Sequence, residues 1–96
     1  MPTIERLNRF KLILSNYVLE SYELNHIIKT ARGNIAQWYP NQTPQAYQAW
    51  LNLDPVQWIT AMTSDNDWGQ QMRESLPYTG LITEEKRLEL YEASQP

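Results

Sequence analysis

The sequence lacks cysteine entirely and has only three glycines among its 96 residues. Without cysteine the chain can form no disulfide, no thiolate metal site and no cysteine nucleophile. Small domains in oxidising compartments are often held together by disulfides, so we expect this chain to be cytoplasmic. With so few glycines there is no glycine-rich loop that could cradle a phosphate or an oxyanion, and we expect no cofactor.

Long hydrophobic runs and a positive charge balance are also missing. The longest apolar run near the N-terminus is Leu12-Ile13-Leu14, which is too short for a signal peptide or a membrane span. The net charge is −3, the pI is near 5.0, and residues 34–72 contain no lysine or arginine. Nucleic-acid affinity depends largely on a positive field. We therefore expect neither a membrane nor a nucleic-acid partner.

What the sequence does contain is typical of a folded protein. Hydrophobic residues make up 42% of the chain and charged residues 20%, which favours one small globular domain over residues 1–96 with a frayed end at about 94–96. Four tryptophans and six tyrosines accompany the single phenylalanine. Because these rings carry an N–H or O–H group, many of them are expected to lie half-buried.

The first third of the chain has the period of an amphipathic helix. From residue 3 to 32 apolar side chains recur at steps of three and four. They are Leu7, Phe10, Leu14, Tyr17, Leu24, Ile28 and Ala31. Thr3 is the expected N-cap and Gly33-Asn34 is the expected end, after which Asn34 to Tyr39 could form one or two helical turns before Pro40. A continuous helix of this length would be about 45 Å long, so it either breaks, near Ser15-Asn16 or Ser21, or protrudes and packs on another chain.

Shorter helices are predicted after this region. Thr43-Pro44 and Asp54-Pro55 each place a capping residue before proline, which suits helices at about 44–53 and 55–63. Val56 and Ile59 share a face of the second, with Trp58 and Met62 alongside. Further helices are expected at about 66–75 and, capped by Thr83, at about 84–93. The predicted fold is all-α, with one long N-terminal helix, continuous or kinked, packed by three to five short helices.

No catalytic or metal-binding constellation is visible in the sequence. His26 is the only histidine, and no cysteine or second histidine accompanies it. Asp65-Asn66-Asp67 begins like a calcium loop, but Gln70 stands where such loops need glycine and Leu76 where they need glutamate. We therefore interpret this segment as a turn with a helix cap and expect neither a metal site nor an enzyme.

The tryptophans are the most informative functional signal. Trp50 and Trp58 have apolar neighbours at helical spacing and are expected in the core. Trp38, Tyr39 and Trp68 stand beside polar or turn-forming residues, and tryptophan at a loop margin is common among binding hot spots. The hypothesis is a non-catalytic accessory subunit or regulator that binds a larger protein, or a second copy of itself, through these three residues. The alternative is a small-molecule-binding module with a Trp/Tyr-lined pocket.

Overall fold

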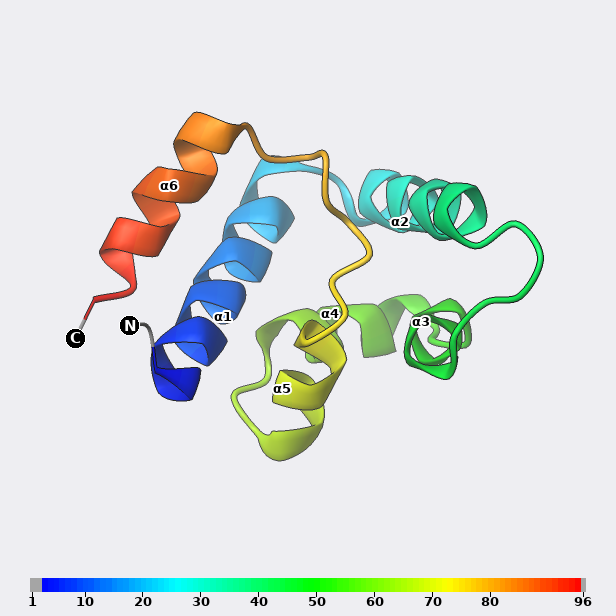
Figure 1. Ribbon diagram of the computed structural model, residues 1–96, viewed down its shortest axis with the longest axis horizontal. Helices are drawn as coiled ribbons and strands as arrows, with labels where there is room; N and C mark the ends of the chain where they lie inside the picture. The colour runs from blue at the N-terminus through cyan, green and yellow to red at the C-terminus, as the bar shows by residue number, and fades with distance from the viewer. Residues whose placement is uncertain (1–2, 96) are drawn as a thin grey trace.

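The N-terminal helical region forms two helices that meet at a sharp break. In the computed structural model, which describes residues 3–95, α1 spans Ile4–Ser21 and α2 spans Leu24–Trp38 (Figure 1). The break follows Ser21, one of the two points at which the sequence favours it, and Tyr22 is extended there. The Tyr22 hydroxyl donates a hydrogen bond to the carbonyl of Leu81 at 2.8 Å. The break is therefore tied to the segment that precedes the last helix.

The predicted helix end at Gly33-Asn34 is wrong, because α2 continues to Trp38. A glycine inside a helix costs about 1 kcal/mol, but Ile35 in the added turn is buried in the core. The Asn34 side-chain amide also donates to two carbonyls of the α5–α6 connection, at 3.0 and 2.8 Å. These contacts stabilise the extra turn. The helix then ends at Trp38, shortly before Pro40.

Four shorter helices follow, and residues 3–95 contain no strand. They are α3 (Gln45–Leu51), α4 (Pro55–Thr63), α5 (Asp67–Arg73) and α6 (Glu84–Ala93). The all-helical prediction is thus confirmed for the described part of the chain, and the four short helices lie close to their predicted positions.

Side-chain caps fix where α4, α5 and α6 begin. Asp54 forms a reciprocal capping box with Gln57, as expected for an Asp-Pro start. The Asn66 side chain accepts the N–H of Gly69 at the start of α5. Thr83 Oγ1 accepts the N–H of Lys86 at 3.1 Å, as predicted for α6.

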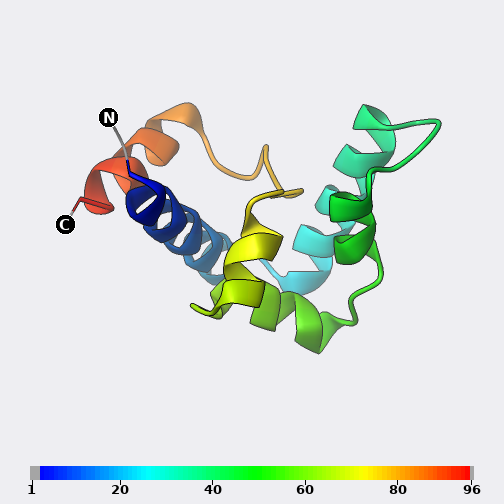
Figure 2. The ribbon, with the colours of Figure 1, turned by 60° about the horizontal axis from the view of Figure 1, so that its bottom comes forward.

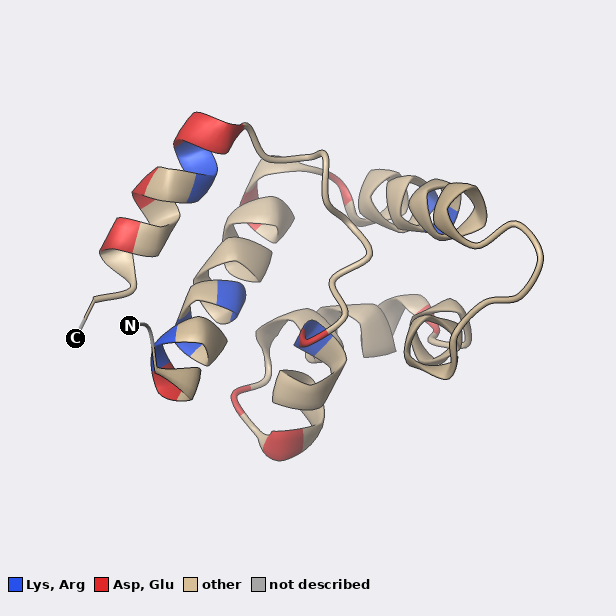
Figure 3. Cartoon of the chain, in the orientation of Figure 1, with Lys and Arg blue, Asp and Glu red and all other residues tan. Residues whose placement is uncertain are grey.

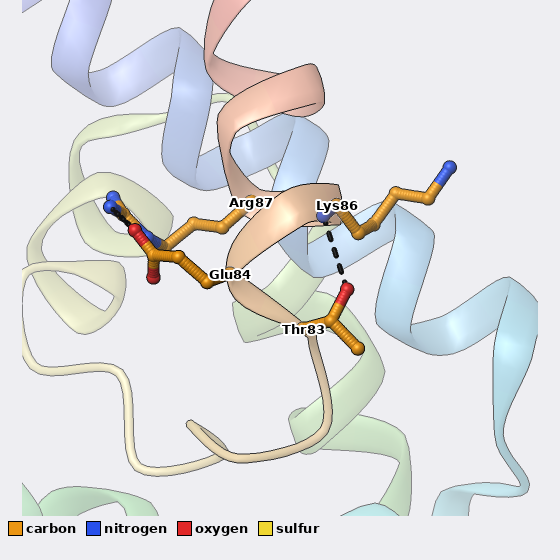
Figure 4. A network of polar contacts seen from close by, with 4 residues as sticks. All are labelled: Thr83, Glu84, Lys86 and Arg87. Atoms are coloured by element: carbon orange, nitrogen blue, oxygen red, sulfur yellow. Dashed lines mark hydrogen bonds and ion pairs between the residues drawn. The ribbon is translucent and has the colours of Figure 1, made fainter.

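The first turn of α6 also carries an exposed ion pair. Arg87 binds the carboxylate of Glu84 through two nitrogens, with distances of 2.6 and 3.1 Å (Figure 4). This pair lowers the pKa of the Glu84 carboxyl, chiefly through the hydrogen bonds from Arg87. The start of α6 is therefore charged as well as capped.

The predicted capping role of Thr43 is wrong. Pro44 adopts an extended conformation with ψ 150°, so α3 begins one residue later, and no side chain caps it. The carbonyl of Pro44 accepts the N–H groups of Tyr47 and Gln48 instead. This helix of seven residues consequently depends on packing for its stability.

Helix α1 lies at the centre of the packing and contacts α2, α4, α5 and α6 (Figure 1). Phe10, Leu14 and Ile28 are buried in the core as predicted, whereas Tyr17 and Leu24 are only partly buried. Helix α6 runs beside α1 on the side of the molecule away from α3 (Figure 2). The molecule measures 39 × 26 × 25 Å. Because α1 ends at Ser21 and α2 begins at Leu24, the alternative of one continuous protruding helix is wrong.

Two apolar groups predicted on helix faces lie outside the core. Val56 and Ile59 of α4 are 71% and 44% exposed, because Trp58, Ala61 and Met62 form the buried face of this helix. Leu7 of α1 is also exposed, since it precedes the part of α1 that packs closely on the core. A short helix offers few apolar positions, so the largest side chains decide which face is buried.

The predicted fraying at 94–96 does not hold for Ser94, which is fully buried. Arg9 Nε donates to the Ser94 carbonyl at 2.9 Å. Arg6 donates to the Tyr91 carbonyl and to the Ser94 hydroxyl, at 3.2 and 3.3 Å. Two α1 arginines therefore satisfy the carbonyl end of α6, where positive charge is favourable. Pro96 lies outside the described residues.

Within the described chain, none of the helices combines the length and apolarity that crossing a bilayer requires.

Candidate functional site

Two of the four tryptophans form the centre of the core, as predicted. Trp50 and Trp58 are fully buried with ring centroids 4.8 Å apart, and Tyr78 meets Trp50 edge-on at 5.7 Å. The Trp50 indole N–H donates to the carbonyl of Met72 at 2.9 Å, which ties α3 to the end of α5. These rings are occupied by packing and are not available to a ligand.

Two polar residues in the core also have structural roles. The hydroxyl of Tyr78 hydrogen-bonds the hydroxyl of Ser15, and burial raises the pKa of the Tyr78 phenol. Arg73 is 1% exposed and donates through Nη1 to the carbonyl of Ala61 in the last turn of α4, at 3.0 Å. Burial lowers the pKa of its guanidinium. Neither group faces solvent, so neither can act on a substrate.

Trp38 and Tyr39 come together with a third ring, Tyr47. Trp38 is 41% exposed at the end of α2. Its ring meets Tyr47 edge-on at 6.0 Å, and the Tyr39 ring lies 5.3 Å from Tyr47 on α3. Partial burial, followed by the electrostatic influence of the nearby Tyr39 phenol, raises the pKa of the Tyr47 phenol. We refer to Trp38, Tyr39 and Tyr47 as the aromatic cluster.

Trp68 occupies a separate position, in a groove between α3 and α5. This hollow has a volume of about 430 Å³, and Trp68 on its wall is 41% exposed. Ala46, Ala49 and Met72 supply apolar lining, and Gln45 and Glu74 supply polar lining. We refer to it as the Trp68 groove.

The structure therefore joins two of the three predicted anchors and separates the third from them. Both sites border α3, because Tyr47 belongs to this helix and Gln45, Ala46 and Ala49 line the groove. Tyr47 was not predicted as a site residue, since its spacing from Trp50 resembles that of a core position. A signal was nevertheless present: no charged residue occurs from Gly33 to Leu53. Figure 3 shows this uncharged region around α3, in contrast to the charged helices α1 and α6.

The remaining candidates for chemistry are accounted for by structural contacts. His26 is exposed and stacks on Tyr22 with ring centroids 5.5 Å apart. Asp65 accepts a hydrogen bond from the Gln70 amide, and Asn66 caps α5. Among residues 3–95, no group of three or more histidine, cysteine, aspartate or glutamate side chains is placed to hold a metal ion. The aromatic cluster and the Trp68 groove instead present aromatic and amide side chains, which are suited to binding another molecule.

No protein-family model matches this chain, and neither the curated proteins nor the solved structures give a significant match. Function must therefore be argued from the site alone.

Proposed function

We propose that this chain is a non-catalytic accessory or regulatory protein that binds a larger protein through the surface around α3. The observation that carries the proposal is the exposure of Trp38 and Trp68 on either side of a helix that has no charged residue. Elsewhere the surface is charged, as Figure 3 shows for α1 and α6. In keeping with its lack of cysteine, we place this activity in the cytoplasm.

The composition of this surface supports binding to protein. The cores of protein interfaces are depleted of charge and enriched in tryptophan and tyrosine, which bury a large area at low entropic cost. The aromatic cluster supplies three such rings, and exposed amides such as Gln45 and Gln48 supply donors and acceptors around them. A partner could therefore desolvate the aromatic cluster without removing water from a charged group.

A small-molecule site is the second candidate, and the Trp68 groove is the observation that favours it. Its volume of about 430 Å³ lies in the range of ligand pockets, but half of its lining residues are polar, whereas such pockets are mainly apolar. Native mass spectrometry of freshly purified protein distinguishes the candidates. A small ligand retained on the 11.3 kDa chain would favour the pocket, and a dimer mass would favour self-association.

Affinity purification from the native host, quantified against matched variants, tests the proposal. Trp38→Ala/Trp68→Ala removes both exposed rings, and Leu88→Ala removes an exposed apolar side chain of α6, which is 51% exposed. We expect a discrete partner to be recovered with wild type and Leu88→Ala, and to be reduced at least about tenfold with the double variant. Equal recovery with all three proteins would contradict the assignment of the surface, provided that the variants melt like wild type.

A further inference from the structure

The Trp68 groove has a charge environment of a single sign. From Gly33 to Glu85 the sequence has one cationic residue, Arg73, and that side chain is buried with a hydrogen bond to the carbonyl of Ala61. The groove itself is lined by the exposed carboxylate of Glu74, and Asp67 is exposed directly before Trp68. No cation of this region can reach the groove to neutralise Glu74.

The accessible cations lie on other parts of the molecule. Arg6 and Arg9 donate hydrogen bonds at the end of α6, Arg87 is paired with Glu84, and Lys86 is paired with Glu89. Lys11, Lys29 and Arg32 lie on α1 and α2, and none of these side chains lines the groove. The lining of the groove thus holds one carboxylate, no cation and an exposed indole ring. A cation that enters it gains from the carboxylate and from the face of the ring at the same time.

Resting on the proposed function, we propose that the Trp68 groove binds a partner segment in which an arginine stands next to an aliphatic residue. The guanidinium lies against the Trp68 ring and pairs with the Glu74 carboxylate. The aliphatic neighbour packs on Ala46, Ala49 and Met72.

Arginine suits this site better than lysine for two physical reasons. Its planar guanidinium can stack on an indole and still donate two hydrogen bonds to a carboxylate, whereas an ammonium acts as a point charge. The guanidinium is also more weakly hydrated than an ammonium group, so its transfer from water into the groove costs less free energy. The mixture of alanine, methionine and carboxylate in the lining is consistent with one charged and one apolar side chain side by side.

The test uses the blocked pentapeptide acetyl-Ala-Leu-Arg-Leu-Ala-amide, titrated into the full-length ¹⁵N-labelled protein at millimolar concentration. We expect the largest shifts at the Trp68 indole N–H and at the amides of Ala46, Ala49 and Glu74. Replacing the arginine of the peptide by citrulline, which keeps its shape and removes its charge, should weaken binding about tenfold. Lysine should give an intermediate affinity. Equal binding of the arginine and citrulline peptides, or no shift at the groove, would overturn the proposal.

Matched protein variants distinguish binding of the peptide in the groove from non-specific attraction of the cationic peptide to the acidic protein. Glu74→Gln should weaken the arginine peptide about tenfold, whereas Glu20→Gln, which makes the same change in net charge on α1, should leave its affinity unchanged. Trp68→Ala should abolish the shifts and Trp38→Ala should preserve them, although the two rings are equally exposed. A loss of affinity that is equal in both glutamate variants would contradict recognition by the groove.

The outcomes also separate this inference from the proposed function. If the pentapeptide does not bind while partner recovery still depends on Trp38 and Trp68, the binding surface is supported and the recognition of arginine is contradicted. If the pentapeptide binds while no partner is recovered, the groove is assigned and the accessory role falls. A dimer in sedimentation experiments that Trp68→Ala dissolves would identify a second copy of the chain as the occupant and overturn the proposal of a separate partner.

Discussion

The small core is covered by charged side chains on the side of α1 and α6, and by uncharged side chains around α3. On the side of α1 and α6, arginines reach the carbonyl end of α6, and ion pairs such as Lys86–Glu89 stand on the surface. Around α3, no charged residue occurs from Gly33 to Leu53 (Figure 3), and Trp38, Gln45 and Gln48 are exposed instead.

The two regions differ in how their exposed rings are held: Tyr22 at the end of α1 is 36% exposed and hydrogen-bonded to Leu81, whereas Trp38 and Trp68 around α3 are each 41% exposed. The aromatic residue Tyr91 of α6 is held by an edge contact to Phe10 and lies under the guanidinium of Arg6, at 4.1 Å. Trp38, by contrast, contacts the Tyr47 ring edge-on and is 41% exposed to solvent. Tyr91 therefore stabilises the packing of α6 on α1, whereas the Trp38 ring remains accessible to the partner that we propose.

The largest difference in stability between the two kinds of position is expected at the tryptophans. Trp50→Ala should lower the free energy of unfolding by about 3–5 kcal/mol, because it removes a fully buried ring and its hydrogen bond to Met72. Trp38→Ala should lower it by less than about 1 kcal/mol, since much of that ring is already in water. Urea unfolding followed by circular dichroism measures both. Comparable losses at the two positions would show that Trp38 is a structural residue.

A second contrast concerns two helical glycines. A Cβ at position 69 would overlap the backbone oxygen of Ser64, so Gly69→Ala should cost about 3 kcal/mol. At Gly33 nothing lies within 4 Å, and Gly33→Ala should stabilise the protein by about 0.5–1 kcal/mol through helix propensity. Thermal unfolding of the two variants checks the signs. A destabilised Gly33→Ala variant would mean that α2 is not helical at this position.

The buried hydroxyl pair predicts a dependence of stability on pH. Tyr78→Phe leaves the Ser15 hydroxyl unpaired and should cost about 1–2 kcal/mol at neutral pH. Because burial raises the pKa of Tyr78, the unfolded chain loses this proton first, at a pH near 10, and wild-type stability should fall as pH rises above that value. Tyr78→Phe should show a shallower decline between about pH 10 and 11. Parallel declines in the two proteins would contradict a buried, protonated Tyr78.

The smallest effect is expected at the end of α6. Arg9→Gln removes a donor to the Ser94 carbonyl and should cost about 0.5–1 kcal/mol at low salt. The loss should shrink in about 1 M NaCl, where such interactions are screened. Arg32→Gln, at an exposed position on α2, serves as the control and should be close to neutral. Urea unfolding at two salt concentrations measures the difference, and salt-independent losses would argue against an electrostatic role.

Much of the helix pattern was predictable because its signals are local. The Asp54 and Thr83 caps lie within three residues of the groups they bind, and the structure confirms both. The prediction at Thr43 was wrong because Pro44 is extended and α3 begins after it. The prediction at Gly33 was wrong because long-range contacts extend the helix: Ile35 is buried in the core, and the Asn34 amide binds a segment more than forty residues away. The same reason explains why Tyr47 was missed, since only the folded chain brings it to Trp38.

Site-specific photo-crosslinking in the native host tests the central claim, that the surface around α3 binds a protein, most directly. A benzophenone side chain at Gln45, an exposed position on the rim of the Trp68 groove, is compared with one at Leu88 on α6. We predict a discrete crosslinked protein from Gln45, none from Leu88, and loss of the Gln45 product when Trp38→Ala/Trp68→Ala is added. The same products from both positions, or none from Gln45, would contradict the claim.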